Sequence, residues 1–338
     1  MAICLSRQAP PCGAKAPRPP MALGRDLAKK LNNGRITPMP TDVCTRKHAL
    51  VTGANSGIGR ATVTALAAQG WHVFAGLHHR DDAGAAYDAN HVTSVRVDVT
   101  DVDALRSAAV EIEQHVRDAG LNALVNNAGV GVAAPLELLP LDKLRSQLEI
   151  NVTGQVAATQ AFLPLVRRAT GRIVFISSVG DRMSMPFAGP LTSSKAALSM
   201  LAHSWRQELA PWGIGVTIVA PALVHTDAAA KLRRDAHVLV ESFAEEGKAR
   251  YSTTFTGMIE HAVAQEKKGS PPSEIAEAVV GALLARRSPT RVVAGKGGRL
   301  LSVVARLPSP LQDRLRRRLF GLPAVNSVPP ARQSVGAG

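Results

Sequence analysis

From residue 48 onward the chain alternates short apolar runs with longer stretches whose apolar residues recur at helical spacing. The short runs predict strands at residues 48–52, 71–77, 94–99, 121–129, 171–178, 215–220 and 290–295. The longer stretches predict helices at residues 57–70, 101–120, 141–168, 193–213 and 271–287. Strands that alternate with helices form parallel sheets, and right-handed crossovers place helices on both faces. The pattern therefore predicts an α/β fold, a doubly wound parallel sheet in a single domain.

The two ends of the chain lack this alternation. Residues 1–47 are rich in Pro and Arg and hold no apolar segment of the kind found in a secretory signal, so we expect a disordered basic leader. An over-long gene start, with Met21 or Met39 as the true start, is an alternative, and the acid-poor composition also faintly resembles a transit peptide. Residues 297–338 are expected to form a basic amphipathic C-terminal extension, which leaves 48–296 as the folded domain.

The composition is that of an ordinary globular protein, with 46% hydrophobic and 20% charged residues among 338. The net charge of +14 comes from the ends, because residues 1–47 carry +7, residues 282–338 carry +10 and the segment between them carries −3. A nucleic-acid-binding domain would gather positive charge on one folded face. We therefore expect no nucleic-acid partner, although solvated basic ends could still touch anionic lipid or nucleic acid loosely.

No apolar run reaches the roughly 18 residues of a membrane-spanning helix. The three cysteines, Cys4, Cys12 and Cys44, precede the predicted domain, so thiolates cannot build a disulfide frame or a metal site within it. We expect no metal and a cytoplasmic location, with membrane association left open.

A glycine-rich turn, TGANSGIG at residues 52–59, joins the first predicted strand to the first predicted helix. Gly53, Gly57 and Gly59 permit a tight turn that brings backbone N–H groups against a phosphate at the helix N-terminus. In this strand–turn–helix context the motif predicts a site for the pyrophosphate of a dinucleotide.

The spacing of these glycines and several later motifs resemble the short-chain dehydrogenase/reductase family. DV at 98–99 ends the third strand, NNAG at 126–129 follows the fourth, and PALVHT at 221–226 follows the sixth, with Ala222 where the family has Gly. The resemblance covers roughly residues 48–296 and implies a Rossmann-type domain that binds NAD(P)(H). It implies a cofactor site formed by Thr52, Gly53, Asn55, Ser56, Gly57, Ile58, Gly59, His78, Arg80, Asp98, Val99, Asn127, Ala128, Gly129, Lys195, Pro221 and Thr226.

In this family an Asn, a Ser, a Tyr and a Lys carry out catalysis, with Tyr and Lys in the pattern Y-x-x-x-K. Residues four apart share a helix face, so the lysine ammonium lowers the pKa of the phenol, which exchanges a proton with the substrate oxygen. The resemblance assigns Asn151, Ser178 and Lys195 to three of these roles and places Leu191 at the tyrosine position. Leucine has no ionisable proton, so a general acid/base contribution of roughly 10² to 10⁴ in rate is expected to be missing.

The resemblance gives each retained residue a task. Asn151 would open the helix locally to place a proton-relay water, Ser178 would orient the substrate oxygen, and Lys195 would bond the nicotinamide ribose. Tyr251 is a candidate substitute acid, although a lone tyrosine in a variable segment more often packs against its neighbours.

The end of the second strand selects between NAD(H) and NADP(H), because an acid there pairs with ribose hydroxyls and a base suits the 2′-phosphate. The chain has His78, His79 and Arg80, followed by Asp81. NADP(H) is therefore favoured over NAD(H), although the two histidines could equally be surface residues without a role.

The expected substrate side is apolar. MSMPFAGP at 183–190 and APLELLPL at 134–141 would form pocket walls, and residues 227–268 lie where the family has a variable lid. With the C-terminal stretch, this resembles the branch that acts on bulky hydrophobic alcohols and ketones such as retinoids or steroids, unless these residues only fill the core. The basic segment at 314–320 would rest on an anionic membrane surface, or pack as a lid or an inter-subunit contact. Family analogy suggests a homo-oligomer.

Two functions remain open. The first is an NAD(P)(H)-dependent oxidoreductase of a hydrophobic alcohol or ketone, impaired by Leu191. The second is a catalytically inactive NADP(H)-binding pseudoenzyme with a sensing or scaffolding role. Retention of Asn151, Ser178 and Lys195 favours the first, and Leu191 favours the second.

Overall fold

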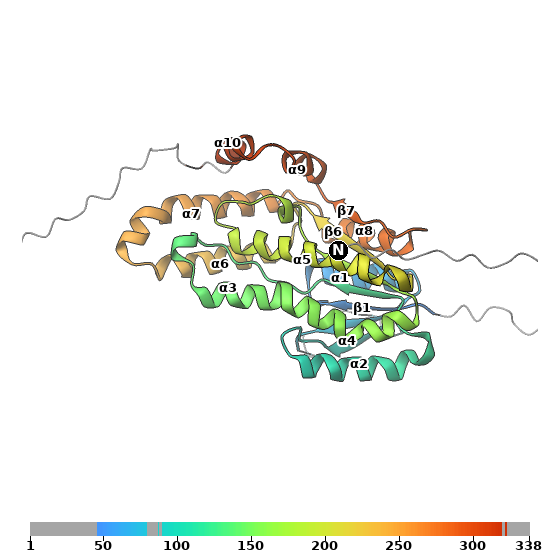
Figure 1. Cartoon of the computed structure of the whole chain (residues 1–338). Coiled ribbons are helices and arrows are strands. Elements are labelled where there is room, and N and C mark those ends of the chain that lie inside the picture. The colour runs from blue at the N-terminus through green and yellow to red at the C-terminus, as the bar shows by residue number, and fades with distance from the viewer. Residues whose placement is uncertain (1–45, 80–86, 88–89, 320–321, 323–338) are drawn as a thin grey trace, which may run out of the picture. The chain divides into compact units, whose positions relative to one another are not determined.

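The computed structural model describes residues 46–79, 87, 90–319 and 322, which form a parallel sheet between two layers of helices (Figure 1). Its seven strands are β1 (His48–Thr52), β2 (His72–Leu77), β3 (Val92–Arg96), β4 (Ala123–Asn126), β5 (Arg172–Ile176), β6 (Gly215–Pro221) and β7 (Arg291–Ala294). They lie in the order β3-β2-β1-β4-β5-β6-β7, and every neighbouring pair is parallel. The predicted doubly wound α/β fold is confirmed.

Five helices cover the two faces of the sheet. One face carries α1 (Gly57–Ala68) and α8 (Pro272–Leu284), and the other carries α2 (Val102–Val116), α4 (Gly154–Arg168) and α5 (Gly189–Leu209). Side chains of a strand alternate between faces, and β1 shows this, because Leu50 packs with the α2, α4 and α5 layer while Ala49 and Val51 pack with α1 and α8. The helices thereby bury nearly all of the sheet's apolar side chains.

The long helix predicted over 141–168 is interrupted in the middle. It consists of α3 (Leu141–Leu148), the π-helical segment η4 (Glu149–Thr153) and α4. The helix predicted over 193–213 is shifted by four residues, because α5 begins at Gly189 and ends at Leu209. Leu191 and Lys195 therefore lie on one continuous helix.

Residues 228–266 form two helices, α6 (Ala228–Glu241) and α7 (Glu245–Glu266), that pack against each other. Their apolar side chains form a third cluster around Phe255, separate from the clusters on the two sheet faces. The described residues also include four short 3₁₀ segments, η2 (Arg117–Ala119), η3 (Leu136–Leu138), η5 (Val179–Arg182) and η6 (Ala210–Trp212).

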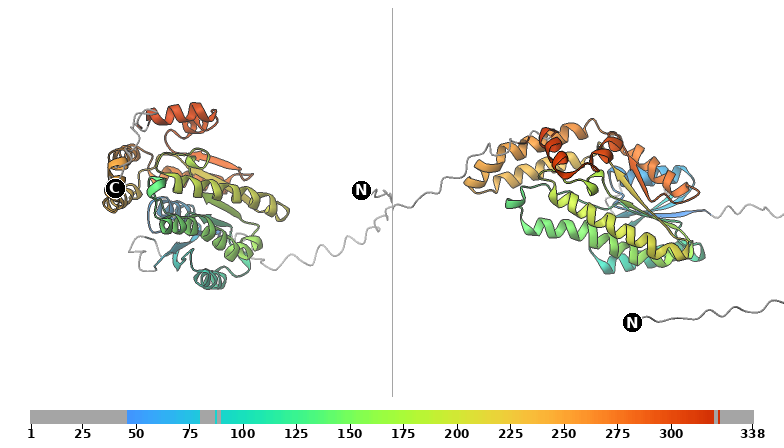
Figure 2. Two further views of the ribbon diagram at one scale, coloured as in Figure 1. Left: turned by 60° about the vertical axis from the view of Figure 1, so that its left-hand side comes forward. Right: turned by 45° about the horizontal axis from the view of Figure 1, so that its top comes forward.

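The C-terminal part adds α9 (Gly298–Val304) and α10 (Ser309–Leu319), which lie beyond the β7 edge of the sheet (Figure 2). Helix α9 packs against η5, and the Arg316 guanidinium donates to Ser184 Oγ at 3.0 Å. The Arg316 side chain is only 12% exposed, so α10 is anchored on the segment that was expected to line the substrate pocket. The described residues contain no helix long and apolar enough to span a membrane.

The predicted leader lies almost entirely in residues 1–45, outside the described residues. The domain boundaries at residues 47 and 296 stay predictions.

The strand order reverses between β1 and β4, and Thr52 joins the ends of these two strands. Its buried hydroxyl accepts from the backbone N–H groups of Asn127 and Ala128, both at 3.0 Å, and lies 3.4 Å from the carbonyl oxygen of Val125. Crevices that bind ligands in open α/β sheets occur at such a reversal, beyond the carboxyl ends of the strands. Thr52 therefore fixes the geometry of the place where a ligand is expected.

Replacing Thr52 by valine tests this link, because valine keeps the shape but leaves two buried N–H groups without an acceptor. We predict that Thr52→Val lowers the free energy of unfolding by about 1–3 kcal/mol, measured by urea denaturation. Thr52→Ser, which keeps the hydroxyl, should lose less than half as much. Equal losses in both variants would show that the methyl group matters and the hydroxyl bridge does not.

Candidate cofactor and active site

The glycine-rich turn packs so tightly that side chains are excluded. Gly53 and Gly57 have φ of +62° and +50°, a region that suits glycine. A Cβ on Gly59 would lie 2.2 Å from Gly53 O and 2.5 Å from Asn127 Nδ2. Asn127 donates from Nδ2 to the carbonyl oxygens of Thr52 and Gly53, at 2.9 and 3.0 Å, and so holds the turn against the end of β4.

The turn opens onto a cavity of about 450 Å³ at the β1–β4 reversal. Twelve of the predicted cofactor residues line it, namely Gly53, Asn55, Ser56, Gly57, Ile58, His78, Asp98, Val99, Asn127, Ala128, Gly129 and Thr226. Ser56 is the N-cap of α1, its side chain makes no capping bond, and the first turn of α1 holds no acid. The positive end of the α1 dipole is thus available to an anion in the cavity.

Four of the predicted cofactor residues that the structure describes do not line this cavity, namely Thr52, Gly59, Lys195 and Pro221. Thr52 lies behind the turn, and Pro221 ends β6 in a buried position. Thr226 closes over the glycine turn, because a Cβ on Gly57 would lie 3.4 Å from its Cγ2. Arg80 lies outside the described residues.

His78 and Asp98 form the rim at the ends of β2 and β3, with His78 Nε2 3.1 Å from Asp98 Oδ2. Burial raises the pKa of Asp98, but the bonds from the Thr100 hydroxyl and N–H and the charge of His78 outweigh burial, so the pKa lies below its ordinary value. Asp98 is therefore ionised near neutral pH and is paired with His78.

Lys195 lies on α5 with its amine buried, the residue being 8% exposed. Its Nζ donates to Ile176 O at 2.8 Å, at the end of β5. Burial lowers the pKa of Lys195 to about 8, although the charge of Asp181 acts in the opposite direction. The amine is thus poised to change its charge near physiological pH.

Asn151 and Lys195 meet at Gly129, the last residue of the NNAG motif. A Cβ on Gly129 would lie 3.2 Å from Asn151 Oδ1 and 3.5 Å from Lys195 Nζ. Asn151 accepts from Val130 N–H at 2.8 Å and donates to Val130 O at 2.9 Å and Ser194 Oγ at 3.0 Å. Because Asn151 lies in the π-helical segment, its side chain joins the loop after β4 to the helix that carries Lys195. Single-turn π segments are frequent at functional sites.

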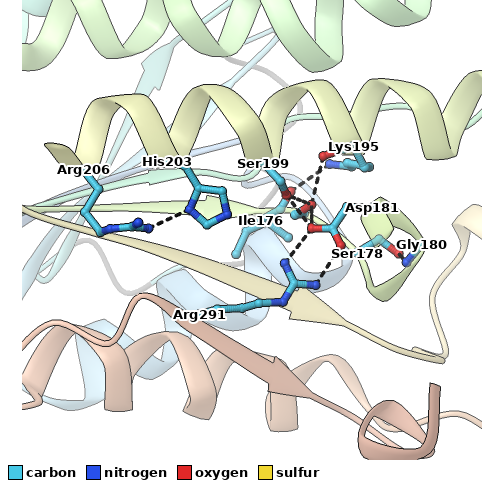
Figure 3. A network of polar contacts seen from close by, with 10 residues as sticks. Ile176, Ser178, Gly180, Asp181, Lys195, Ser199, His203, Arg206 and Arg291 are labelled. Carbon is cyan, nitrogen blue, oxygen red and sulfur yellow. Dashed lines mark hydrogen bonds and ion pairs between the residues drawn. The ribbon is translucent and has the colours of Figure 1, made fainter. Parts of the chain in front are cut away.

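Ser178 follows β5 and is the N-cap of η5, where its Oγ accepts from Gly180 N–H at 3.0 Å (Figure 3). That bond uses an oxygen lone pair, so the hydroxyl proton is left for a further acceptor. The structure therefore places Asn151, Ser178 and Lys195 on three segments that converge at the carboxyl ends of β4 and β5.

Leu191 lies on α5 one turn before Lys195 and is partly buried. A Cβ on Gly131 would lie 3.8 Å from Leu191 Cδ2, so the leucine side chain packs toward the loop that follows β4. Hydrocarbon thus occupies the helix face shared with the amine.

Tyr251 is engaged elsewhere. It lies on α7, and its hydroxyl donates to Glu137 Oε2 at 2.6 Å. That bond, burial and the Glu137 charge raise the pKa of Tyr251 above its ordinary value. A phenol held in this way is a poor substitute acid.

The segments expected to form substrate walls do come together. Ala134 N–H donates to Phe187 O at 2.8 Å, and the Phe187 ring contacts Phe255 of α7 edge-on at 5.5 Å between centroids. Gly247 of α7 approaches Leu138, because a Cβ there would lie 2.9 Å from Leu138 Cδ1. The helices α6 and α7 thus cover the apolar segments on the side of the sheet that carries Ser178.

Sequence reasoning missed the buried carboxylate behind Lys195. Asp181 and Arg291 form a bidentate ion pair with N–O distances of 2.7 and 2.8 Å (Figure 3). The available signal was a charged residue at the start of a short apolar strand, Arg291, and an acid shortly after the fifth predicted strand, Asp181. Among the described residues, no group of three or more His, Cys, Asp or Glu could hold a metal ion.

Comparison with known proteins agrees with this geometry. Residues 47–237 match the family described as short chain dehydrogenase. The NADPH-dependent 3-dehydrocapnine reductase of Ornithobacterium rhinotracheale is 31% identical over 277 residues, which cover 80% of this chain and 95% of the relative. The chain belongs to the short-chain dehydrogenase/reductase family and is an oxidoreductase by that membership.

Two further similarities fit the same family. Estradiol 17-beta-dehydrogenase 2 of Rattus norvegicus is 36% identical over 195 residues, which cover 56% of this chain and 50% of the relative, so the chain matches about half of that protein's length. A solved short-chain dehydrogenase from Streptomyces avermitilis superposes with a TM-score of 0.64 at 27% identity, covering 83% of this chain and 97% of that one.

The residues present fit a dinucleotide. In the glycine cradle, a Cβ on Gly53 or Gly59 would collide with the backbone of the turn and its neighbours, the α1 N-terminus borders the cavity, and Lys195 lies beside Gly129, which lines the cavity. We predict that Gly59→Ala weakens NADPH binding by about tenfold or more, measured by fluorescence titration, because its methyl would displace the turn.

Gly281→Ala is the matched control, since a Cβ at Gly281 on α8 meets nothing within 4 Å. It should leave the affinity unchanged. Unaltered binding by a folded Gly59→Ala variant would contradict the cradle.

Proposed function

We propose that this protein is an NADP(H)-dependent oxidoreductase of a hydrophobic alcohol or ketone in which proton transfer is slow. The observation that carries the proposal is the convergence of Asn151, Ser178 and Lys195 beside the dinucleotide cavity, with Leu191 on the helix turn before the amine. On this proposal, Asn151, Ser178 and Lys195 bind and orient the cofactor and the substrate. Leu191 cannot transfer the proton that a tyrosine would transfer from the same position.

The nicotinamide cofactor would supply or accept the hydride. On this proposal the glycine turn and the α1 N-terminus bind its pyrophosphate, and the Lys195 amine binds its ribose. The Ser178 hydroxyl donates to the substrate oxygen and stabilises the charge that develops there. Lys195, whose pKa of about 8 keeps it mostly protonated at pH 7, adds positive charge near the same oxygen.

A hydrophobic substrate is supported by the apolar cluster of α6, α7 and Phe187, which borders the proposed reaction site. It is also supported by the similarity to a protein named for estradiol, a steroid alcohol. Helix α10 favours the lid interpretation of the C-terminal extension, because Arg316 bonds Ser184 next to this cluster. Contact with an anionic membrane and assembly into a homo-oligomer stay predictions.

The preference for NADP(H) is supported by the charge at the end of β2. His78 lies 3.1 Å from Asp98 and, when protonated, offsets part of the repulsion that this carboxylate would exert on a 2′-phosphate. Arg80 follows in sequence. The relative from Ornithobacterium rhinotracheale is named as NADPH-dependent.

Leu191 also supports the second candidate, a cofactor-binding protein that senses or scaffolds without turnover. Every cofactor contact proposed above is independent of residue 191. A pseudoenzyme of this kind would bind NADPH tightly and leave it unoxidised.

Leu191→Tyr tests the missing acid. We predict that the variant increases the single-turnover rate of NADPH oxidation with a panel of hydrophobic ketones by about a hundredfold or more, because the phenol would stand one turn before Lys195. Leu191→Phe is the matched control, since it adds the ring without the hydroxyl, and it should give no gain. Equal rates for all three proteins would mean that another group delivers the proton, and no turnover in any of them with tight NADPH binding would favour the pseudoenzyme.

Cofactor preference is tested by measuring dissociation constants for NADPH and NADH. We expect tighter binding of NADPH, and a loss of about tenfold or more for NADPH alone in His78→Gln/Arg80→Gln, because charge-assisted bonds to phosphate disappear. Arg106→Gln removes an exposed charge on α2 and should change neither constant. Tighter binding of NADH by the unaltered protein would overturn the preference.

A further inference from the structure

Asp181, a carboxylate to which the proposed function assigns no role, lies next to the proposed active site. Asp181 belongs to η5, three residues after Ser178, and its side chain is 0% exposed. Arg291 of β7 donates to both of its oxygens, at 2.7 and 2.8 Å. Buried carboxylates are costly unless they are paired and hydrogen-bonded, and this one is both.

The same carboxylate is bonded to α5, the helix that carries Lys195. Ser199 Oγ lies 2.5 Å from Asp181 Oδ2 (Figure 3). Ser177 Oγ lies 2.9 Å from the same oxygen and 2.8 Å from Ser199 Oγ. Ser199 stands one turn after Lys195. Asp181 thus joins the end of β5, the Lys195 helix and β7 at a single point.

The segment at the end of β5 contacts both the backbone and the side chain of Lys195. Ser177 Oγ lies 3.3 Å from the backbone carbonyl oxygen of Lys195. The carbonyl oxygen of Ile176, the residue before Ser177, accepts from the Lys195 amine at 2.8 Å. These contacts tie the backbone and the amine of Lys195 to the end of β5.

We propose that Asp181 is a positioning residue for Lys195, holding its helix turn against β5 through Ser177 and Ser199 and supplying a buried negative charge that keeps its amine protonated. The proposal concerns the site described under the proposed function, but it does not require turnover. Arg291 donates to both oxygens of the carboxylate and fixes its orientation.

The other charged groups around this point do not take over that task. On α5, His203 has its pKa lowered by burial and then by Arg206, Arg182 and Arg291, so it is neutral above pH 7. Its Nδ1 lies 2.7 Å from Arg206 Nη1, which fits an imidazole that accepts. The arginines are positive and oppose protonation of the amine. Asp181 is the described carboxylate whose charge raises the pKa of Lys195.

The direction of the effect follows from charge. An amine that loses a nearby anion binds its proton less tightly, so its titration midpoint falls. Removing a hydrogen bond at the same carboxylate while keeping its charge should leave the midpoint in place. The two kinds of change therefore separate electrostatics from packing.

The test is an NMR titration of the full-length protein labelled with ¹³C at lysine Cε, in which the Lys195 signal is assigned by its loss in Lys195→Met. We expect a midpoint near 8 for the unaltered protein. Asp181→Asn should lower it by about one pH unit. Ser199→Ala, which keeps the carboxylate, is the matched control and should not move it.

Asp181→Asn leaves a buried guanidinium without its partner and risks unfolding, so Asp181→Asn/Arg291→Gln provides a neutral pair. It should lower the midpoint by less than Asp181→Asn does, because it also removes the positive charge of Arg291, with folding checked by circular dichroism. An unchanged midpoint in either folded variant overturns the proposal, as does an equal shift in Ser199→Ala. Absence of NADPH binding would refute the proposed function and leave this titration as informative as before.

Discussion

The reversal of strand order between β1 and β4 is the constraint on which the site depends, because it forces the chain to leave the sheet in opposite directions and opens a crevice between the strand ends. The Thr52 hydroxyl joins those ends, and Asn127 joins the glycine turn to β4. Both contacts are made by short polar side chains inside a close-packed layer. On the proposed function, the backbone N–H groups at the α1 N-terminus would bind the pyrophosphate in this crevice.

Beside this crevice lies the buried amine of Lys195, and leucine occupies residue 191, where the family has a tyrosine. Burial makes the ammonium costly, and its remaining support comes from Ile176 O and from the charge of Asp181. A tyrosine at residue 191 would have shared that proton, whereas leucine leaves Lys195 to act alone. On the proposed function, the site retains the groups that bind and orient a cofactor and a carbonyl, and proton transfer is its slow step. The substitution at residue 191 affects that step and leaves the proposed cofactor contacts unchanged.

Much of this was predictable from sequence because the cofactor motifs are local. The glycine turn, DV at 98–99 and NNAG at 126–129 each follow a strand, so strand order alone brings them together. The Asp181–Arg291 pair was not predictable in the same way, because it joins residues 110 positions apart whose packing depends on the β6–β7 pairing. The π-helical segment also escaped periodicity, since one extra residue in a turn hardly changes the apolar pattern over 141–168. The position of the C-terminal helix α10 was also not predictable, because it depends on the contact between Arg316 and Ser184.

The central claim is that proton delivery, rather than hydride transfer, limits this protein. The most direct measurement is a single turnover of bound NADPH with a reducible hydrophobic ketone, in H₂O and in D₂O, using cofactor with hydrogen or deuterium at the transferred position. The account predicts a rate that falls markedly in D₂O and changes little with deuterated cofactor. A rate that ignores D₂O and falls with deuterated cofactor would show that hydride transfer is limiting and would contradict the account.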